Sequence, residues 1–562
     1  MKKSTLLLLP AVAMLASCSK LKLTADNFQV TPTPLEYVGG EVPATISANI
    51  PAKAFPKKAV VTCIPVLKYN GTQTTGEGAT FQGEKVEANN TVISYANGGH
   101  ATMRTSFPFV DAMATSDLYM TFQAKKGNKT IKVPEVKIGY GVNATAALVR
   151  ETAKTGNFSI APDNFQRIIS QKQAANIKFL IGQANLRGSE LNSQNVKDFI
   201  ATLKNIKNDQ QSLVLKNIDV SAYASPDGAY NINERLAERR GEVAEDYAKK
   251  QLKGQKLDGD VNMKYTAEDW EGFQELVSQS NLQDKDVILR VLSMYQDPEQ
   301  REQEIKNIST VYGDLAKAIL PELRRSRMII NYDVIGRSDA EILAQYDADA
   351  SKLSVEEMLY AGDVLTKGTA KAKAILAKTT DLYPNDYRAY NNLAVAALAE
   401  GNNDLAKQYI SKAQAINATA GEPNINLGLI AIQNGDFAAA ENYIAKAANV
   451  NGSDEATGIL NIAKGKYSQA ASLLGNSSTN SAALAKILAN DYVGAASTLS
   501  GIKNADAYTA YLKAILAARQ GDSSALQSNL ASAISQNSSL AQKAAKDLEF
   551  VKYANIISAL VK

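Results

Sequence analysis

Histidine, tryptophan and cysteine are almost absent from this 562-residue chain. His100 is the only histidine and Trp270 the only tryptophan, and the two cysteines are Cys18 and Cys63. A single histidine excludes most Ser-His-Asp and Cys-His catalytic sites and all multi-histidine metal sites. We therefore predict a protein that is not an enzyme and holds no cofactor or metal. His100 follows Gly98-Gly99 and is predicted to lie in a loop, whereas Cys63 is predicted to be a small buried hydrophobic residue.

Long apolar runs and a strong net charge are also missing. No stretch after the first residues is long and apolar enough to cross a bilayer. The formal charge of +4 would fall to about +2 if Lys2 and Lys3 were removed. A charge so near balance argues against a nucleic-acid partner or a polybasic membrane surface.

The first residues have the order of a secretory signal. Lys2 and Lys3 precede a short apolar core, and Leu15-Ala16-Ser17-Cys18 ends the segment with small residues before a cysteine. This arrangement resembles a bacterial lipobox, which implies a signal peptide over 1–17 and acylation (palmitate among the chains) of Cys18. The alternative is an ordinary signal peptide with an unrelated cysteine. Several acyl chains would hold the protein to a membrane almost permanently, because each buried CH₂ contributes about 0.8 kcal/mol.

Two further features of this N-terminus bear on localisation. By resemblance to lipoprotein sorting rules, Ser19 directs the protein to the outer membrane, and residues 18–29 form a lipidated linker. No acidic cluster follows Ser19, so the best-known surface-export signal of Bacteroidetes lipoproteins is missing. We therefore expect the periplasmic face rather than the cell surface.

The chain divides into three compositional regions after this linker. Residues 30–155 show short alternating runs such as 44–50 and 118–124 separated by glycine turns, which predicts an antiparallel β-sandwich. Residues 160–340 alternate strands (177–181, 213–223, 261–265 and 328–335) with helices (190–206 and 231–252), which predicts an α/β sandwich. The stretch between Trp270 and Pro321 is predicted to be a helical insertion. Trp270, with Phe273 at i+3, is predicted to dock its helix on a core.

Residues 350–562 contain an internal repeat. Three sets of small or apolar residues recur every 34 residues, and they are Leu359, Leu393 and Leu427; Ala372, Ala406 and Ala440; and Leu376, Ile410 and Ile444. This pattern resembles the tetratricopeptide repeat, in which small residues let two antiparallel helices pack closely. Later units recur at a spacing of 25, as in 465–470 and 490–495, so shortened helix pairs are expected there. We predict five or six pairs, against the alternative of a generic helical bundle.

The most specific motif is 221–228, Ser-Ala-Tyr-Ala-Ser-Pro-Asp-Gly, followed by Asn233, Leu236 and Arg240. It resembles the core of the OmpA-like peptidoglycan-associated domain, in the version found in Bacteroidetes lipoproteins. Phe179, Leu186, Leu191 and Arg324-Arg325 extend the resemblance over about 170–335. Aligning Gly228, Asn233 and Leu236 places Arg240 on the arginine of that family that binds ligand, and Ser225 on its ligand-binding aspartate.

The resemblance implies a grip on diaminopimelate, the zwitterionic amino acid of peptidoglycan stems. A carboxylate would bind its ammonium and a guanidinium its carboxylate, each pair being worth about 1.5–3 kcal/mol. Arg240 would supply the guanidinium, but Ser225 carries no charge, so Asp227 would have to reach the ammonium. The predicted site is therefore Ser225, Asp227, Asn233 and Arg240. The alternative is a plain Pro226-Asp227-Gly228 turn with Arg240 paired to an acid such as Glu238.

Three functions compete on this evidence. The first is an envelope tether that binds peptidoglycan through the OmpA-like domain and a protein partner in the concave groove of the repeats. The second is a pure protein-interaction scaffold, or a surface antigen, in which the peptidoglycan site has been lost. The third is a glycan hydrolase. It is disfavoured because Glu268, Asp269 and Glu271 are neighbours in sequence, not a facing pair of acids.

Overall fold

The computed structural model describes residues 21, 23–282, 285–307, 309–447 and 449–561. Cys18, Ser19 and the predicted signal peptide lie outside the described residues. The contacts divide the chain into two compact units, and the first, residues 1–163 with 362–562, is interrupted in sequence by the second, residues 164–361. The sheet-rich region and the helical repeats thus share one unit, which we call the sheet–repeat unit, and residues 164–361 are called the α/β unit.

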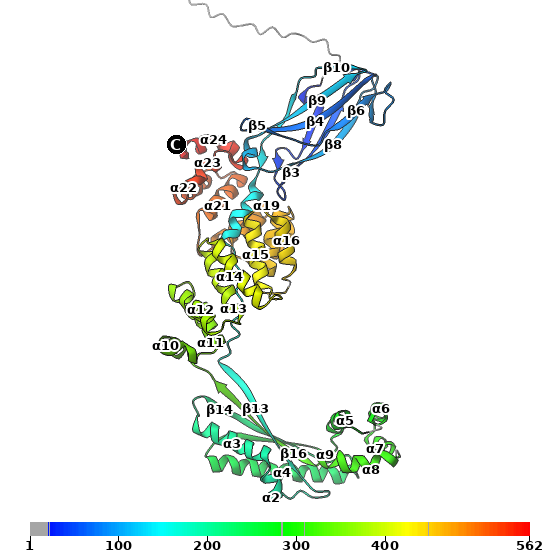
Figure 1. Cartoon of the computed structure of the whole chain (residues 1–562), viewed down its shortest axis with the longest axis vertical. Coiled ribbons are helices and arrows are strands. Elements are labelled where there is room, and N and C mark those ends of the chain that lie inside the picture. The colour runs from blue at the N-terminus through cyan, green and yellow to red at the C-terminus, as the bar shows by residue number, and fades with distance from the viewer. Residues whose placement is uncertain (1–20, 22, 283–284, 308, 448, 562) are drawn as a thin grey trace, which may run out of the picture. The chain divides into compact units, whose positions relative to one another are not determined.

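The N-terminal part of the sheet–repeat unit is built from β-strands on a common core (Figure 1). One sheet has the order β1-β3-β8, a second has the order β10-β9-β4-β6-β7 with β11 on β9 and β5 on β4, and β12 and β2 form a separate parallel pair. The strands are β1 (Phe28–Thr31), β2 (Leu35–Glu36), β3 (Glu41–Ile50), β4 (Ala59–Tyr69), β5 (Thr72–Thr75), β6 (Ala79–Gly83), β7 (Thr91–Ile93), β8 (Gly99–Pro108), β9 (Asp117–Lys126), β10 (Lys129–Ile131), β11 (Val136–Tyr140) and β12 (Val142–Asn143).

Side chains alternate along these strands between the core and the solvent. In β3, Val42, Ala44, Ile46, Ala48 and Ile50 are buried on one face. Cys63 is buried in β4, as predicted, and burial raises the pKa of its thiol to about 12. The prediction for His100 is wrong, because it lies in β8, exposed and opposite Asn49. Gly98 pairs with Ser94 and ends a hairpin turn, and β8 already begins at Gly99.

The C-terminal part is a series of helix pairs with short turns (Figure 1). Its helices are α12 (Ala370–Leu382), α13 (Tyr387–Ala399), α14 (Asn403–Ile416), α15 (Glu422–Gln433), α16 (Phe437–Ala445), α17 (Ser453–Ala463), α18 (Tyr467–Leu473), α19 (Asn480–Leu488), α20 (Tyr492–Gly501), α21 (Ala507–Gln520), α22 (Ser523–Gln536), α23 (Ser539–Ala544) and α24 (Ala554–Leu560). The predicted tetratricopeptide-like repeat is confirmed in this architecture, including the shortened pairs α17–α18 and α19–α20. In the sets that recur every 34 residues, Ala406, Ala440 and Ile410 are fully buried between helices.

A left-handed residue marks the turn inside each of five consecutive pairs. The residues with positive φ are Gly401, Gly435, Gly465, Asn490 and Gly521. Glycine adopts this conformation without a steric penalty, and asparagine tolerates it better than most residues. In four of the five turns the next helix is then capped by a side chain, from Asn402, Asp436, Asp491 or Asp522.

The α/β unit contains a four-stranded sheet of order β13-β16-β14-β15, in which only β14 and β15 are parallel. Its elements are β13 (Ile168–Lys178), α2 (Gly188–Leu191), α3 (Gln194–Asn208), β14 (Leu213–Tyr223), α4 (Tyr230–Gln255), β15 (Asp260–Thr266), α5 (Trp270–Gln279), α6 (Lys285–Met294), α7 (Pro298–Asn307), α8 (Ser309–Ala318), α9 (Leu320–Leu323), β16 (Arg325–Ile335), α10 (Asp339–Asp349) and α11 (Val355–Tyr360). Helices α3 and α4 pack on one sheet face over Ile177, Ile218 and Met328.

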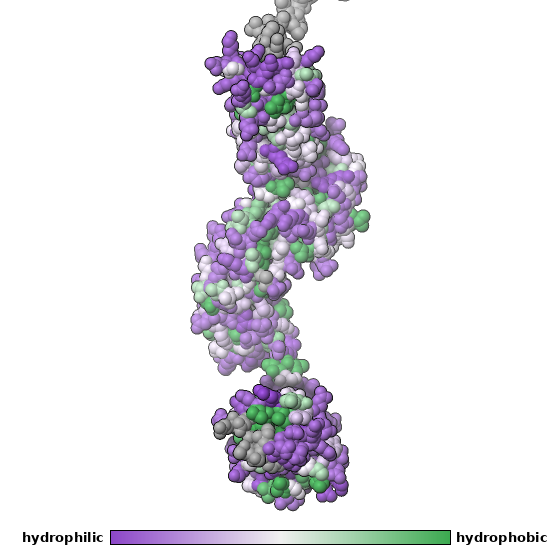
Figure 2. Space-filling model, turned by 90° about the vertical axis from the view of Figure 1, so that its right-hand side faces the viewer, coloured by the Kyte–Doolittle hydropathy of each residue, from purple (hydrophilic) through white to green (hydrophobic). Residues whose placement is uncertain are grey.

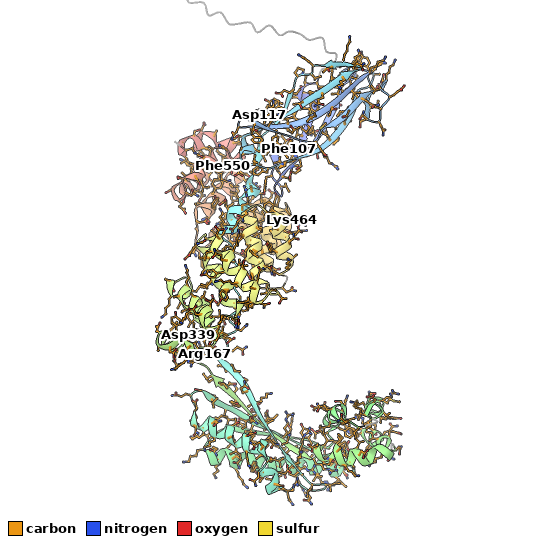
Figure 3. All side chains as sticks on the ribbon, in the orientation of Figure 1. Phe107, Asp117, Arg167, Asp339, Lys464 and Phe550 are labelled. Atoms are coloured by element: carbon orange, nitrogen blue, oxygen red, sulfur yellow. The ribbon has the colours of Figure 1, made fainter. Side chains whose placement is uncertain are left out.

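Most elements predicted for this region are present with small shifts, and the first strand is the exception. The apolar run 177–181 was expected to be the strand, but β13 ends at Lys178, and Leu180 and Ile181 are exposed. The strand instead runs back to Ile168 through polar residues paired with β16. An ion pair between Arg167 and Asp339 joins the start of β13 to α10 (Figure 3).

The predicted helical insertion is present as α5 to α9 and has its own core. Asp269 caps α5 by accepting a hydrogen bond from the Gly272 N–H at 2.9 Å. Trp270 packs edge-on against Phe273, with ring centroids 5.6 Å apart, as expected of a helix docked on a core. The buried members of this core include Phe273, Val277, Ile288, Leu292, Leu315 and Leu323.

Candidate functional site

The concave face of the repeats, where a protein partner was expected, holds a segment of the chain itself. This groove segment, residues 145–163, consists of short helical turns at Thr145–Leu148, Val149–Thr152 and Ala153–Thr155, followed by non-helical chain. It contacts the first helix of four successive pairs, α13, α15, α17 and α19. Leu148, Val149 and Ala153 are buried in the same core as residues of α15, α17 and α19. The prediction that a partner occupies this part of the groove is therefore corrected.

Three buried asparagines hold the second half of the groove segment by its backbone. Asn426 accepts a hydrogen bond from the Ser159 N–H at 2.8 Å and donates one to the Ser159 carbonyl at 2.9 Å. Asn392 likewise accepts a hydrogen bond from the Ala161 N–H at 2.8 Å and donates one to the Ala161 carbonyl at 3.0 Å. Asn391 donates to the Ser159 carbonyl at 2.9 Å. Side-chain amides thus satisfy both polar groups of each backbone unit in a buried place, where unpaired groups would be costly.

Further polar contacts extend along the segment in both directions. The hydroxyl groups of Thr152 and Ser481 are 3.0 Å apart, and Gln433 donates to the Ala153 carbonyl at 3.2 Å. At the far end, Arg388 donates to the Asp163 carbonyl at 3.0 Å. Because these contacts span α13 to α19, the segment fastens the sheet-rich region to the repeats.

Sequence reasoning missed this arrangement, although one signal for it exists. Asn392 and Asn426 are 34 residues apart, which is the repeat period, and both are buried. Asparagine in the interior of an apolar helix face is expected only where its amide has partners. A polar residue recurring at the repeat spacing would have indicated a bound backbone.

The turn predicted to bind peptidoglycan lies between β14 and α4 in the α/β unit. The Ser225 hydroxyl donates to the Asp227 carboxylate, and Arg324 binds both, with Nε 3.2 Å from the Ser225 hydroxyl and Nη2 3.2 Å from Asp227 Oδ2. The side chains of Arg324 and Asp227 are 11% and 14% exposed. The structure therefore brings Ser225 and Asp227 together, and it adds Arg324, which the resemblance had placed only at the approach to the last strand.

Arg240 lies beneath this turn and is fully buried. Its guanidinium donates to three backbone carbonyls, those of Gln183 at 3.0 Å, Tyr223 at 2.9 Å and Leu180 at 3.2 Å. It also lies over the ring of Phe179. Burial, with a smaller effect of Arg324, lowers the pKa of Arg240 to about 10, which leaves it charged at neutral pH. The alternative pairing with Glu238 is wrong, since the backbone carbonyls take that place.

Asn233 and the helical insertion complete the surroundings of the turn. Asn233 donates to the Gly228 carbonyl at 3.3 Å, and Glu302 of α7 accepts a hydrogen bond from the Gly228 N–H at 2.7 Å. Gly228 has a φ of +118°, a conformation that side-chain-bearing residues rarely adopt. Pro226 borders the insertion core near Trp270 and Ile305. Asn233 therefore shapes the turn, and the insertion covers one side of it.

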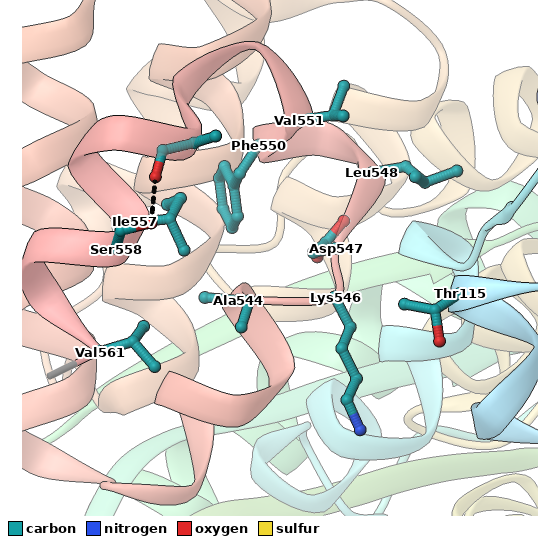
Figure 4. Close-up of a pocket in the computed structure, with 12 residues that line it drawn as sticks. Thr115, Ala544, Lys546, Asp547, Leu548, Phe550, Val551, Ile557, Ser558 and Val561 are labelled. Carbon is teal, nitrogen blue, oxygen red and sulfur yellow. Dashed lines mark hydrogen bonds between the residues drawn. The ribbon is translucent and has the colours of Figure 1, made fainter. Parts of the chain in front are cut away.

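A separate cavity of about 510 Å³ lies at the end of the repeats (Figure 4). Its lining combines Phe550, Ile557 and Val561 with Lys546 and Thr115, so it is mainly apolar with a polar rim. Elsewhere, the visible face in Figure 2 is largely hydrophilic, with apolar residues in small scattered groups. Among the described residues, no three His, Cys, Asp or Glu side chains are grouped so as to hold a metal ion. None of the described helices has the length and apolar character needed to cross a membrane.

Comparison with known proteins gives no family assignment. No family model matches the chain, and no curated protein matches it. Among solved structures it is similar to Pseudomonas aeruginosa PilF (19% identity, 39% of this chain and 100% of that chain, TM-score 0.26). It is also similar to PilW, described as a type IV pilus biogenesis factor (15% identity, 40% of this chain and 96% of that chain, TM-score 0.25).

A third similar structure is a tetratricopeptide repeat protein from Parabacteroides merdae (13% identity, 46% of this chain and 98% of that chain, TM-score 0.27). TM-scores this low do not establish that this chain shares a fold with any of these three proteins. The assignment of the repeats rests instead on the periodicity and helix pairs of the chain itself.

Proposed function

We propose that this protein is a non-enzymatic protein-interaction scaffold of the cell envelope. The observation that carries the proposal is the groove segment, whose backbone is bound by Asn391, Asn392 and Asn426. This binding joins a sheet-rich region and a helical repeat array into one body with two kinds of surface. Helical repeats present extended surfaces suited to protein partners, and such a body needs no catalytic group.

The anchoring part of the proposal rests on the sequence alone. Leu15-Ala16-Ser17-Cys18 supports lipidation of Cys18 and attachment to the outer membrane, with the chain facing the periplasm. The lipid would hold the scaffold at the membrane surface while its other surfaces remain free for partners.

Labelling and crosslinking test the scaffold proposal. Cells expressing the full chain would be fed an alkyne fatty acid, treated with a membrane-permeable crosslinker and fractionated, beside a Cys18→Ala variant. The expected result is fatty-acid label on the original chain alone, and specific crosslinked protein partners that are lost or reduced when the anchor is absent. Absence of both label and crosslinked partners would contradict the proposal.

Peptidoglycan binding is the second candidate, and one observation favours it. Asp227 and Arg324 form a slightly exposed carboxylate–guanidinium pair at the turn, and both groups interact electrostatically with the charged Arg240. A zwitterionic amino acid could replace the contact between these two side chains. Its ammonium would bind Asp227 and its carboxylate would bind Arg324. Arg240 itself would support the site from below, because its donors already bind backbone carbonyls.

Sedimentation with insoluble peptidoglycan tests this second function. The full chain, Asp227→Asn and Arg324→Gln would be compared with Arg239→Ala, which removes an exposed arginine on the same helix. Pelleting of the original chain and the Arg239 variant, but not of the other two, would support wall binding. No pelleting of any protein would leave the scaffold alone. Release of soluble muropeptides would support a hydrolase instead.

A further inference from the structure

The last part of the groove segment has one hydrogen-bonded edge and one free edge. The N–H and C=O groups of Ser159 and Ala161 all bind asparagine side chains. The N–H and C=O groups of Phe158 and Ile160 have no hydrogen-bond partner among the described residues. In extended chain, successive residues direct these groups to opposite edges. The pairing of alternate residues therefore indicates an extended segment whose second edge is unpaired.

A hollow of about 820 Å³ adjoins this free edge. Phe158 and Ile160 line it together with three apolar side chains of the repeats, Val395, Val450 and Leu473. All five are partly exposed, and Leu473 is 41% exposed. Charges of both signs, from Lys367 and from Asp454 and Glu455, also border the hollow. The two residues with unpaired backbone groups thus line a space with apolar walls.

We propose that this edge binds an extended peptide segment of a protein partner by β-strand addition. The proposal deepens the scaffold function and rests on it. Main-chain N–H and C=O groups would pair with Phe158 and Ile160, and alternate side chains would pack on Val395 and Leu473. The occupant is a peptide because only a second backbone repeats donors and acceptors at the spacing of this edge. An extended apolar chain without such groups would leave the edge unpaired.

The charges and the groove segment itself define what the partner contributes. Because acidic and basic groups both border the hollow, the net charge of a peptide should have little effect on its binding. Recognition depends instead on main-chain pairing and on apolar residues at alternate positions of the peptide. Ser159 and Ala161 stay bound to the asparagines, so the partner adds to the groove segment and does not displace it. The segment acts as the first strand of a two-stranded site inside the repeats.

Fluorescence anisotropy tests the proposal with a defined probe. The probe is a labelled, acetylated and amidated hexapeptide of alternating Val and Thr, titrated with the full-length chain in detergent. Val395→Trp fills the hollow, and Ile160→Pro removes one N–H donor of the free edge while keeping the preceding residue extended. Val493→Trp, on the outer surface at 83% exposure, is the matched control.

The expected result is saturable binding to the original chain and to Val493→Trp, and binding at least tenfold weaker to Val395→Trp and Ile160→Pro. A probe with N-methyl groups on the amides of one edge should also lose binding, whereas methylation of the other edge should not. Thermal unfolding identifies an Ile160→Pro chain that has not folded, in which case Val395→Trp decides.

Two outcomes would overturn the proposal. One is equal binding to Val395→Trp and the original chain, and the other is no binding of the probe to the original chain. Crosslinking in cells separates this failure from failure of the scaffold function. Partners that still crosslink to Val395→Trp would preserve the scaffold and reject the free edge as their site, whereas absence of partners from the original chain rejects the scaffold itself.

Discussion

The side-chain amide of Asn426 pairs with both backbone groups of Ser159, 267 residues earlier in the chain. Asn392 repeats this pairing with Ala161 one helix pair away. An asparagine amide carries one acceptor and two donors, so it can match the N–H and C=O of one extended residue. At Ser159 and Ala161 the asparagines of the repeats therefore bind the backbone of the groove segment.

Asn426→Ala should destabilise the sheet–repeat unit by about 1–3 kcal/mol, because it leaves the buried Ser159 N–H without a partner. Urea unfolding followed by far-UV circular dichroism measures the change. Asn555→Ala, at an exposed helical position of α24, should stay within about 0.5 kcal/mol of the original chain. Equal effects of the two substitutions would show that the pairing contributes nothing.

Amide hydrogen exchange should alternate along the groove segment. The Ser159 and Ala161 N–H groups are bonded and buried and should exchange slowly, whereas those of Phe158 and Ile160 should exchange much faster. Mass spectrometry with fragmentation that preserves residue-level label can measure this. Uniform protection across residues 158–161 would contradict the extended, one-sided arrangement.

Arg240→Ala should destabilise the α/β unit by about 3 kcal/mol or more, because three backbone carbonyls lose their donor. Trp270 is the only tryptophan and lies in this unit, so its fluorescence reports the unfolding of this unit. Arg239→Ala removes a neighbouring exposed arginine and should leave the transition almost unchanged. A ligand-binding role without a structural one predicts equal stability for the two variants.

Asp363 should contribute a loss of stability of the sheet–repeat unit as the pH rises from about 4 to 7. Burial raises the pKa of Asp363 to about 7, against the Asn392 hydrogen bond that lowers it. Because the folded pKa lies above the unfolded value, the unfolded state loses this proton first, and ionisation in the folded state is disfavoured. Asp363→Asn should flatten this part of the stability curve, measured by urea unfolding at several pH values. An unchanged slope in that variant would assign the pH dependence to other groups.

Cys63 should resist thiol reagents in the folded protein. Its thiol is buried in β4 with a pKa raised to about 12, so almost no thiolate exists at neutral pH. A Cys18→Ser chain, in which Cys63 is the only cysteine, should react with a disulfide reagent in urea and hardly at all in buffer. Rapid reaction in buffer would show that β4 opens readily.

Local signals predicted many elements because they depend on neighbouring residues. The run Leu213–Tyr223 is β14 as expected, and the 34-residue spacing of Ala372, Ala406 and Ala440 indicates the helix pairs. The position of β13 was predicted wrongly because pairing with β16, and not alternation in the sequence, brings the polar residues 170–173 into the strand. For the candidate site, the motif located the turn with Ser225 and Asp227, but neither Arg324 nor the carbonyl ligands of Arg240 follow from spacing.

The amino-acid sequence by itself determined the classes of structure, through alternation, the repeat period and turn residues such as Gly401 and Gly435, since these act over a few residues. It also carried the prediction of lipid at Cys18. Only the tertiary structure decided that residues 145–163 lie in the groove of the repeats and that the charge of Arg240 is used internally. Both depend on which distant backbone groups remain unpaired after local structure has formed, and burial makes each of those groups find a partner.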